Sequence, residues 1–221
     1  GWVADTASVD DSAYVGRYAK VYGNAKVYGD SKISENVTIC GNAEVTGNVD
    51  VSGDAKVTGN AKVTSDALVD GCGYVPVSGY AQVSGNAEVS GDALVSENSK
   101  VTGNSMISGN AVIYGDAQVS GNAKVYEDAM VSGNAEVTGY VEVTGYAQVS
   151  GYTIVSEKAE VTGDAMVSEN AMIYGDAKVY GYAKVYGYAQ VFGDSKVSGY
   201  AKVCGDAKVH GNDLVTGNDL V

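Results

Sequence analysis

Residues 173–191 read IYGDAKVYGYAKVYGYAQV, and this stretch repeats one six-residue unit three times. Each unit has an aliphatic residue, a variable residue, usually Gly, then Asn, Asp or Tyr, then Ala, and a second variable residue. Nearly the whole 221-residue chain follows this pattern, so we expect one repeat domain rather than several. The 30 Gly residues recur with a period, which indicates repeated turns rather than a flexible linker.

The aliphatic residue marks the phase of the repeat. It recurs every six positions from Val3 to Val69 and again from Val77 to Val221. The step from Val69 to Val77 is two residues longer than the others. The chain therefore reads as one continuous domain with a first block, 1–69, and a second block, 77–221. A two-residue insertion within 70–76 (DGCGYVP) joins the two blocks.

The period predicts short strands. Around each marker three residues alternate out, in, out, as in Lys178-Val179-Tyr180, which is a strand with one buried side chain. β-Branched Val and Ile favour this conformation, and Gly followed by Asn or Asp favours a turn. Ala is small enough to lie inside the corner. A helix is disfavoured, because a six-residue spacing does not stay on one helical face.

A strand this short is stable only when it is stacked on others. We expect each strand to pair in parallel with the strands one coil above and below it. Three hexads per coil give a triangular prism with 18 residues per turn, and the chain is long enough for about twelve coils. At a spacing of ~4.8 Å per coil the rod would be roughly 55–60 Å long. The predicted fold is an all-β, single-domain parallel β-helix.

The hexad resembles the repeat of the hexapeptide-repeat family of left-handed parallel β-helices, which includes sugar-nucleotide acyltransferases and γ-type carbonic anhydrases. The resemblance extends from Val3 to Val221 and rests on an aliphatic residue followed four positions later by a small one. It implies a left-handed coil, which the spacing alone does not. One departure is the residue after the aliphatic one, which is mostly Ser, Thr or Tyr here and often small or acidic in that family.

The functional residues of that family have no counterpart here. Its acyltransferases use a catalytic His in a cleft between subunits, and its carbonic anhydrases hold zinc with three His. The single His of this chain is His210, which should face outward after Val209. No phosphate-binding loop, dinucleotide fingerprint or Ser-His-Asp order occurs. We expect no catalytic, cofactor or metal site, and a protein that is not an enzyme.

The cysteines favour neither a disulfide framework nor a zinc site, because Cys40, Cys72 and Cys204 are far apart and no CxxC pair occurs. Cys40 and Cys204 follow marker residues and should point outward. Cys72 lies in the insertion, where we expect the most reactive thiol. A calcium ladder is an alternative use of the turns, although the GGxGxD pattern of calcium-binding repeats is absent.

The formal net charge of −13 disfavours binding to nucleic acid, which needs clustered Lys and Arg, and to anionic membranes. Solubility is the plain explanation of the charge, and mimicry of DNA is the alternative. No apolar run is long enough to span a membrane. Residues 1–11 lack a signal-peptide pattern, although a signal could have been removed. The compartment is unknown, with an extracellular or cell-surface location slightly favoured.

Substitutions at the first turn position suggest a rule. Glu replaces Gly there five times, and the next residue is then Asn, Asp or Lys but never Tyr. We expect the turn to need one permissive residue of the two, so that Asn or Asp adopts the left-handed angle when Gly is absent. Gly187→Ala, which precedes Tyr188, should then destabilise more than Gly85→Ala, which precedes Asn86. The five Glu residues are Glu35, Glu97, Glu127, Glu157 and Glu169.

Residues 18 apart in the second block should be stacked neighbours. Corner columns interleave Asp, Asn and Tyr, which mostly separates like charges that would otherwise lie ~4.8 Å apart. Asn residues in such columns should form amide ladders. On the strands, Lys124 lies over Glu142 and Glu160 over Lys178, and these exposed pairs should contribute little.

Two outward surfaces are candidate sites. The first is a mostly apolar column that marks a candidate interface, with ordinary exposure on a rod as the alternative. The second is a set of aromatic residues near the C-terminal third, which could bind a sugar or a protein or simply cover the strands. In it we expect Tyr174 to stack on Phe192 and Tyr182 on Tyr200. The interface candidates are Leu94, Val112, Met130 and Met166, in a column with Pro76 and Gln148. The binding-surface candidates are Tyr174, Tyr180, Tyr182, Tyr186, Tyr188, Phe192 and Tyr200.

The first and last hexads are irregular. Asp213 and Asp219 occupy positions where Ala normally lies, and a charge at an inward corner is costly unless it is satisfied. We expect degenerate terminal coils that resist further stacking. A segment of a longer array that stacks end to end, or an engineered regular repeat, are the alternatives.

These observations predict a non-enzymatic structural β-solenoid that serves as a rigid spacer, surface or filament component. It would self-associate through the apolar column or through its ends. The alternative is a glycan- or protein-binding module that uses the Tyr-rich columns. Ice binding ranks lower, because it needs flat rows of paired Thr and only one of the two outward positions is commonly Ser or Thr. We expect no nucleic-acid partner and no membrane insertion.

Overall fold

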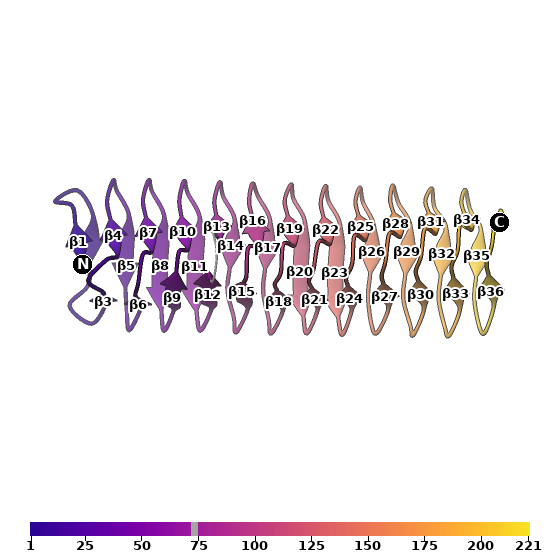
Figure 1. Ribbon diagram of the computed structural model, residues 1–221, viewed down its shortest axis with the longest axis horizontal. Helices are drawn as coiled ribbons and strands as arrows, with labels where there is room; N and C mark the ends of the chain where they lie inside the picture. The colour runs from indigo at the N-terminus through magenta and orange to yellow at the C-terminus, as the bar shows by residue number, and fades with distance from the viewer. Residues whose placement is uncertain (72–74) are drawn as a thin grey trace.

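The computed structural model describes residues 1–71 and 75–221, which form a straight rod with the two termini at opposite ends (Figure 1). The described chain contains 36 short β-strands. They form three parallel sheets of twelve strands each, so the predicted all-β parallel β-helix of about twelve coils is confirmed. Cys72, where we expected the most reactive thiol, lies outside the described residues.

Each sheet takes every third strand of the chain, so one coil contributes one strand to each sheet. Sheet A contains β1 (Trp2–Val3), β4 (Lys20–Val21), β7 (Thr38–Ile39), β10 (Lys56–Val57), β13 (Pro76–Val77), β16 (Leu94–Val95), β19 (Val112–Ile113), β22 (Met130–Val131), β25 (Gln148–Val149), β28 (Met166–Val167), β31 (Lys184–Val185) and β34 (Lys202–Val203).

Sheets B and C have the same design. Sheet B contains β2 (Ser8–Val9), β5 (Lys26–Tyr28), β8 (Glu44–Gly47), β11 (Lys62–Ser65), β14 (Gln82–Val83), β17 (Lys100–Val101), β20 (Gln118–Gly121), β23 (Glu136–Gly139), β26 (Ile154–Val155), β29 (Met172–Ile173), β32 (Gln190–Val191) and β35 (Lys208–Val209). Sheet C contains β3 (Tyr14–Val15), β6 (Lys32–Ile33), β9 (Asp50–Gly53), β12 (Leu68–Gly71), β15 (Glu88–Ser90), β18 (Met106–Ile107), β21 (Lys124–Val125), β24 (Glu142–Val143), β27 (Glu160–Val161), β30 (Lys178–Val179), β33 (Lys196–Val197) and β36 (Leu214–Val215).

The register confirms the phase slip read from the sequence. Markers pair with markers throughout, as Val95 pairs with Ile113 one coil later. Across the insertion Val57 pairs with Val77, two residues further along than in the other coils. The pairs of the other two sheets shift by the same two residues before the regular register resumes. One coil therefore absorbs the insertion, and all three sheets continue through it.

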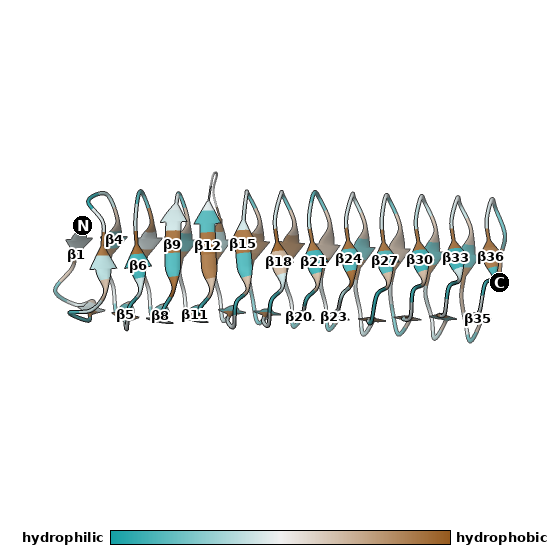
Figure 2. Cartoon of the chain, turned by 90° about the horizontal axis from the view of Figure 1, so that it is seen from below, coloured by the Kyte–Doolittle hydropathy of each residue, from teal (hydrophilic) through white to brown (hydrophobic). Residues whose placement is uncertain are grey.

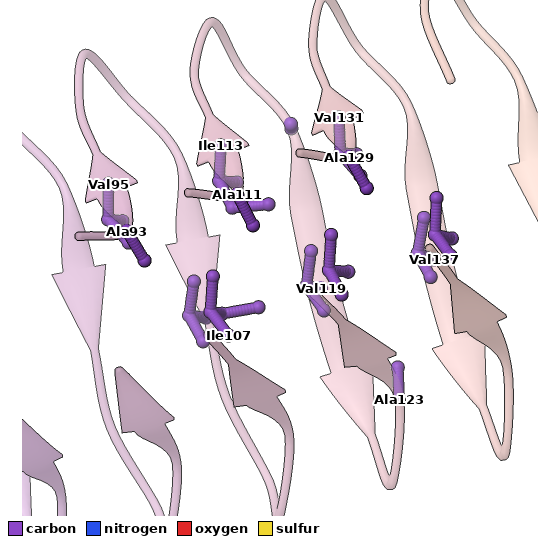
Figure 3. Close-up of a cluster of buried hydrophobic side chains, with 14 of the residues drawn as sticks. Ala93, Val95, Ile107, Ala111, Ile113, Val119, Ala123, Ala129, Val131 and Val137 are labelled. Atoms are coloured by element: carbon purple, nitrogen blue, oxygen red, sulfur yellow. The ribbon is translucent and has the colours of Figure 1, made fainter. Parts of the chain in front are cut away.

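The core is a column of Val and Ile markers with small residues at the corners (Figure 3). Marker side chains such as Ile113 and Val119 are fully buried, as is corner Ala117. Burying one such aliphatic side chain stabilises the fold by roughly 1.5–3 kcal/mol. Some corners hold Ser instead of Ala, and Ser99 donates its hydroxyl to the carbonyl of Ser96 at 2.7 Å. The buried hydroxyl is thus satisfied within its own turn.

The outward faces are largely polar. Figure 2 shows hydrophobic and hydrophilic residues alternating within strands of sheet C, as expected when only the marker points inward. No helix in the described part of the chain has the length and hydrophobicity that a membrane span requires.

The turn rule expected from the sequence is wrong. Glu97 has φ of 60° and Glu157 has φ of 64°, so Glu itself adopts the left-handed angle. Among the described residues, those that follow the turn Glu residues do not have positive φ. The angle lies at the first turn position even where Asn or Asp follows, because each turn is stacked on the turn of the next coil and must follow the same path. Gly85 and Gly187 accordingly have nearly equal φ values of 74° and 76°.

At two of the five Glu turns the side chain provides a compensation that glycine cannot. The Glu127 carboxylate accepts hydrogen bonds from the N–H of Gly145 and the hydroxyl of Thr144, both at 2.8 Å. The Glu97 carboxylate accepts the N–H of Gly115 at 3.0 Å. In each case the side chain reaches the turn one coil ahead. A hydrogen bond to a charged group contributes about 1.5–3 kcal/mol when shielded and less when exposed, which offsets the ~1–2 kcal/mol cost of the angle.

Candidate functional site

An open groove of about 1060 Å³ runs along the outer face of sheet A near the C-terminal end of the rod. Its floor is the outward column of Gln148, Met166, Lys184 and Lys202, which lie on four consecutive strands, β25, β28, β31 and β34. Leu220 extends the floor by one more coil through a bridge with Lys202. The groove thus follows the rod axis over five coils. Its complete lining is Tyr146, Gln148, Asp164, Met166, Tyr182, Lys184, Tyr186, Tyr200, Lys202, Asn218 and Leu220.

One wall of the groove is the corner column that precedes sheet A. Tyr182 and Tyr200 stack face to face there, with ring centroids 5.0 Å apart and planes 5° from parallel. This confirms the stacking expected from the sequence. Tyr146 lies two coils before Tyr182, and the short side chain of Asp164 occupies the coil between them. Tyr146, Tyr182 and Tyr200 are 64, 52 and 61% exposed, so a ligand can reach their rings.

The other wall includes Tyr186, which follows marker Val185 on sheet A. A hydrogen bond with Cys204, one coil ahead, raises the pKa of the Tyr186 hydroxyl, and the charge of a Cys204 thiolate would raise it further. The Tyr186 proton is therefore directed toward Cys204 rather than free for a ligand. Tyr22 and Cys40 form the same pair near the other end of sheet A, and there too the pKa of the tyrosine is raised.

The floor carries positive charge in an acidic protein. Lys184 and Lys202 are direct register partners, so their side chains leave the sheet one coil apart. Neither of them forms an ion pair within residues 1–71 and 75–221. Asp164, on the wall nearby, likewise has no hydrogen bond or ion pair to the described residues. The groove therefore presents two cations and one anion without partners among the described residues, together with several tyrosine faces.

The groove unites parts of both surfaces that the sequence singled out. Met166 comes from the apolar column, and Tyr182, Tyr186 and Tyr200 come from the aromatic set. The candidate residues predicted from the sequence did not include Tyr146, Asp164, Lys184 or Lys202. The signal for them was present, because in the column Tyr146, Asp164, Tyr182, Tyr200 a short residue interrupts a run of tyrosines.

The remaining aromatic candidates lie on other surfaces. Tyr174 and Phe192 stack on sheet B at 4.8 Å with planes 2° apart, as expected. His210 continues this stack with a ring 5.5 Å from Phe192 and, as expected, is exposed. Tyr180 follows β30 on sheet C, and Tyr188 lies at the corner that follows sheet A. The seven aromatic candidates therefore do not form one continuous surface.

The apolar column is continuous but only partly exposed. Leu94, Val112 and Met130 are register partners on β16, β19 and β22, and all three side chains are half-buried. The Tyr114 hydroxyl donates to the Met130 sulfur at 3.6 Å and covers part of it. Met166 is separated from the other three by Gln148. The column presents less apolar surface than four free side chains would.

Asn side chains 18 residues apart are stacked neighbours, as the repeat predicts. The Asn86 amide donates to Asn104 at 3.0 Å and the Asn104 amide to Asn122 at 3.3 Å, which confirms the amide ladder. A second ladder joins Asn24, Asn42 and Asn60 at 3.1 Å per step.

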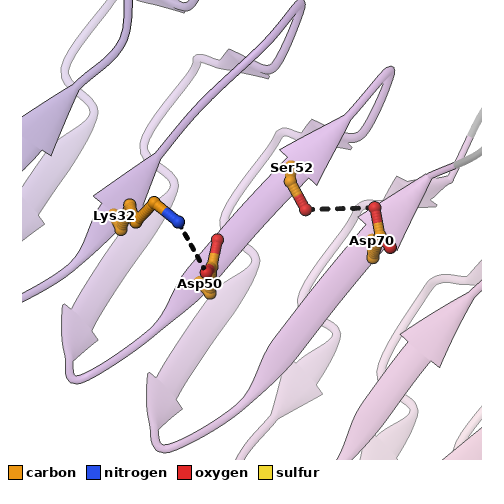
Figure 4. Close-up of polar contacts among 4 residues, drawn as sticks. All are labelled: Lys32, Asp50, Ser52 and Asp70. Atoms are coloured by element: carbon orange, nitrogen blue, oxygen red, sulfur yellow. Dashed lines mark hydrogen bonds and ion pairs between the residues drawn. The ribbon is translucent and has the colours of Figure 1, made fainter.

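Ion pairs join strands one coil apart. The expected pairs of Lys124 with Glu142 and Lys178 with Glu160 are present at 3.6 and 2.8 Å. The hydrogen bond to Glu160 raises the pKa of Lys178. In the first block Lys32 contacts Asp50 at 3.3 Å, and a hydrogen bond joins Ser52 to Asp70 (Figure 4).

The other sequence-derived candidates are placed as follows. Cys40 and Cys204 are partly buried. Asp213 and Asp219 accept the backbone N–H groups of His210 and Thr216, each at 3.1 Å, so their charges are satisfied by their own turns. In the described chain no group of three or more His, Cys, Asp or Glu side chains could hold a metal ion.

Comparisons with known proteins find a match to one repeat model and similarity to several solved structures. Residues 81–97, 105–121 and 117–133 match the YdcK beta-solenoid repeat. Among solved structures, the chain is similar to the UDP-N-acetylglucosamine O-acyltransferase LpxA of Moraxella catarrhalis RH4 at 13% identity and a TM-score of 0.49, covering 75% of this chain and 68% of that one. No curated protein matches the chain.

Two further acyltransferases match at comparable sequence identity but with lower TM-scores. LpxA of Bacteroides fragilis 9343 is 16% identical with a TM-score of 0.26, and 87% of this chain and 67% of that one are covered. The Arabidopsis UDP-N-acetylglucosamine acyltransferase is 15% identical with a TM-score of 0.33, and 98% and 69% are covered. The expected resemblance to the hexapeptide β-helices is thus found at low identity. It concerns the fold alone and transfers no activity to this chain.

Proposed function

We propose that this chain is a non-enzymatic structural β-solenoid that acts as a rigid spacer or surface component. The observation that supports the proposal is the continuity of its three sheets, each of which pairs all twelve of its strands without a break. A hinge would have to break the strand pairing of all three sheets within the same coil. Even the coil that contains the insertion keeps its strand pairing in all three sheets. Each backbone hydrogen bond lost in bending would cost about 1 kcal/mol.

Small-angle X-ray scattering tests the rod directly. At concentrations low enough for single chains, the expected result is one elongated particle whose length is about twelve coil spacings, roughly 55–60 Å, and whose dimensions do not change with salt. Several particle lengths, or a length that changes with ionic strength, would show a hinged chain and refute the rigid rod.

Self-association through the apolar column is the second part of this proposal. Leu94 and Val112 are adjacent and half-buried, so a second copy could cover them. Lys occupies the same outward position in the same sheet at Lys56 and Lys184, which means that Leu94→Lys with Val112→Lys should leave the fold intact. Analytical ultracentrifugation should show an oligomer that this double variant loses. A wild-type chain that stays monomeric at all concentrations would refute self-association and leave the rod in place.

A second candidate function is a glycan- or protein-binding module, and the groove on sheet A favours it. The groove combines exposed tyrosine faces with unpaired charged groups, which is the mixture that recognition sites use. A glycan array tests this candidate, and an array without a hit would refute its glycan form. Ice binding is the lowest-ranked candidate, and a measurement of thermal hysteresis tests it.

A further inference from the structure

We propose that the groove on sheet A binds a linear anionic polysaccharide, and that one sugar ring of this ligand fills a vacant position in the tyrosine column. The inference rests on the binding function proposed above as the second candidate, and it names the ligand class and the residues. The column consists of Tyr146, Asp164, Tyr182 and Tyr200 along one wall of the groove.

The vacant position follows from the stacking geometry. Tyr182 and Tyr200 show that rings in adjacent coils stack at 5.0 Å. Tyr146 and Tyr182 are two coils apart, which is about 9–10 Å. That distance is one ring too long for direct stacking and fits one inserted ring. Because the side chain between them is the short Asp164, the space at ring level is open to the groove.

The chemistry around this position suits a sugar ring. A pyranose presents C–H groups on its faces, which pack on aromatic rings, and hydroxyl groups on its edge, which donate hydrogen bonds. Tyr146 and Tyr182 supply the aromatic faces, and the unpaired Asp164 carboxylate can accept from the hydroxyls. Gln148 on the adjoining floor can both donate and accept.

The length of the groove favours a polymer over a single ring. From Gln148 to Leu220 the floor spans five coils, and four coil spacings amount to about 19 Å. A single ring would occupy one coil of this length. Because Tyr146 and Tyr182 would cover both faces of the inserted ring, the chain must leave it through the ring edge and continue over the floor, where further sugars could reach Lys184 and Tyr186.

The floor explains why the ligand should be anionic. Lys184 and Lys202 lie one coil apart, repel each other and have no acidic partner among the described residues. Sugar carboxylates above them would relieve this repulsion. Two lysines are too few for nucleic acid, which needs a series of cations along its phosphates. The Asp164 carboxylate would repel an anion but accept a hydroxyl, so the ring in the vacant position is oriented with its carboxylate toward the lysines.

Isothermal titration calorimetry with β-1,4-linked oligomannuronates of three to five sugars, whose equatorial linkages leave both ring faces open, tests the proposal. The matched probe is the methyl-esterified oligomer, which has the same rings without the charge. We expect the acidic oligomer to bind, and the esterified one to bind at least about tenfold more weakly. Binding should weaken with salt, because the lysines are exposed to solvent. Lys184→Gln with Lys202→Gln should reduce the affinity for the acidic oligomer to that of the ester.

The decisive variant is Asp164→Tyr, which fills the vacant position with a protein ring. The fold should accept it, because Tyr182 and Tyr200 occupy the same column after glycines of similar φ to Gly163. Binding should be lost while the melting temperature stays within a few degrees of wild type. Asp116→Tyr is the matched control, since it adds a tyrosine at a corner outside this groove and should leave affinity unchanged.

Several outcomes would overturn the proposal. These are undiminished binding by Asp164→Tyr, equal affinity for the acidic and esterified oligomers, no binding of either by the wild type, or equally tight binding of polyglutamate, which would indicate an acidic protein partner. Different results would refute the anionic polysaccharide ligand and the binding module. Array hits to neutral glycans alone, with none to the oligomannuronate or another acidic glycan, would refute this ligand class and leave the binding module. The rigid rod is tested separately by scattering.

Discussion

Replacing Gly85 or Gly187 with alanine should destabilise the rod by nearly the same amount. Their φ values are 74° and 76°, and an added Cβ would lie 2.8 Å from a backbone atom of the next coil in both cases, the oxygen of Gly103 or the nitrogen of Gly205. Asn86 follows one and Tyr188 the other, but this difference should not matter. The angle is imposed by stacking, so the following residue cannot take it over.

The size of the effect has two parts. An L-residue in the left-handed region costs about 1–2 kcal/mol. A Cβ within 3 Å of backbone adds a further steric cost of about 1–2 kcal/mol, near the low end for overpacking, since the coils already accommodate Glu at five such turns. We expect a total of about 2–4 kcal/mol for either substitution. Gly205→Ala separates the two parts, because Gly205 has φ of 63° and no atom within 4 Å of an added Cβ, and it should cost only about 1–2 kcal/mol.

Urea denaturation followed by circular dichroism gives the three free energies of unfolding. The expected order is Gly85→Ala equal to Gly187→Ala, with both more destabilising than Gly205→Ala. If Gly187→Ala costs over about 1 kcal/mol more than Gly85→Ala, the turn does depend on the following residue, and the argument from stacking is refuted. If Gly205→Ala costs as much as the other two, the steric part of the argument is wrong.

Three further predictions concern single side chains. Glu127→Gly should be about 1 kcal/mol more destabilising than Glu157→Gly in the same assay. Both substitutions remove the strain of a left-handed angle at Glu, but only Glu127→Gly loses carboxylate hydrogen bonds. Equal free energies of unfolding would show that those hydrogen bonds contribute nothing. Asn104→Ala should cost about 1–2 kcal/mol through the loss of two ladder hydrogen bonds, with the solvent-exposed Lys100→Ala as a control that should change stability little. The pKa of Lys178 is raised in the folded chain, so its ion pair stabilises the fold below the unfolded pKa of about 10.4 and this contribution is lost as the pH rises through the folded value. Lys178→Gln should therefore cost under about 1 kcal/mol at pH 7 and still less at pH 12, and a constant cost in urea titrations at the two pH values would contradict this.

The fold was predictable because every coil repeats the same local sequence pattern. Val179 is followed by a turn and then by Ala183 before the next marker, Val185, and this order alone defines an inward residue, a turn and a corner. Pairing residues by the 18-residue period then gave correct neighbours, including the stack of Tyr182 on Tyr200. The amide ladders and two ion pairs followed from the same alignment, since in a stacked coil the nearest long-range neighbour has a fixed sequence separation.

The groove was not predictable from single columns. It is formed where the corner column of Tyr146 and Asp164 meets the floor column of Met166 and Lys184. From the sequence, the aromatic residues were predicted to form one surface and the apolar column another. Which columns share a face, and how deeply their side chains lie, depends on the corner angles and on the lengths of neighbouring side chains.

The sequence by itself determined the period, the strands, the inward residues and the order of neighbours along each column, because these depend on local alternation and on a constant repeat length. Only the tertiary structure decided that the left-handed angle belongs to the first turn residue, including Glu97, since stacking of whole coils overrides the preference of any residue pair. It also decided that Tyr182, Met166 and Lys184 face one groove while Tyr174 and Phe192 lie on another sheet. The physical reason is the same in both cases: a repeat defines each coil, but packing between coils and around corners defines the backbone strain and the shape of the surface.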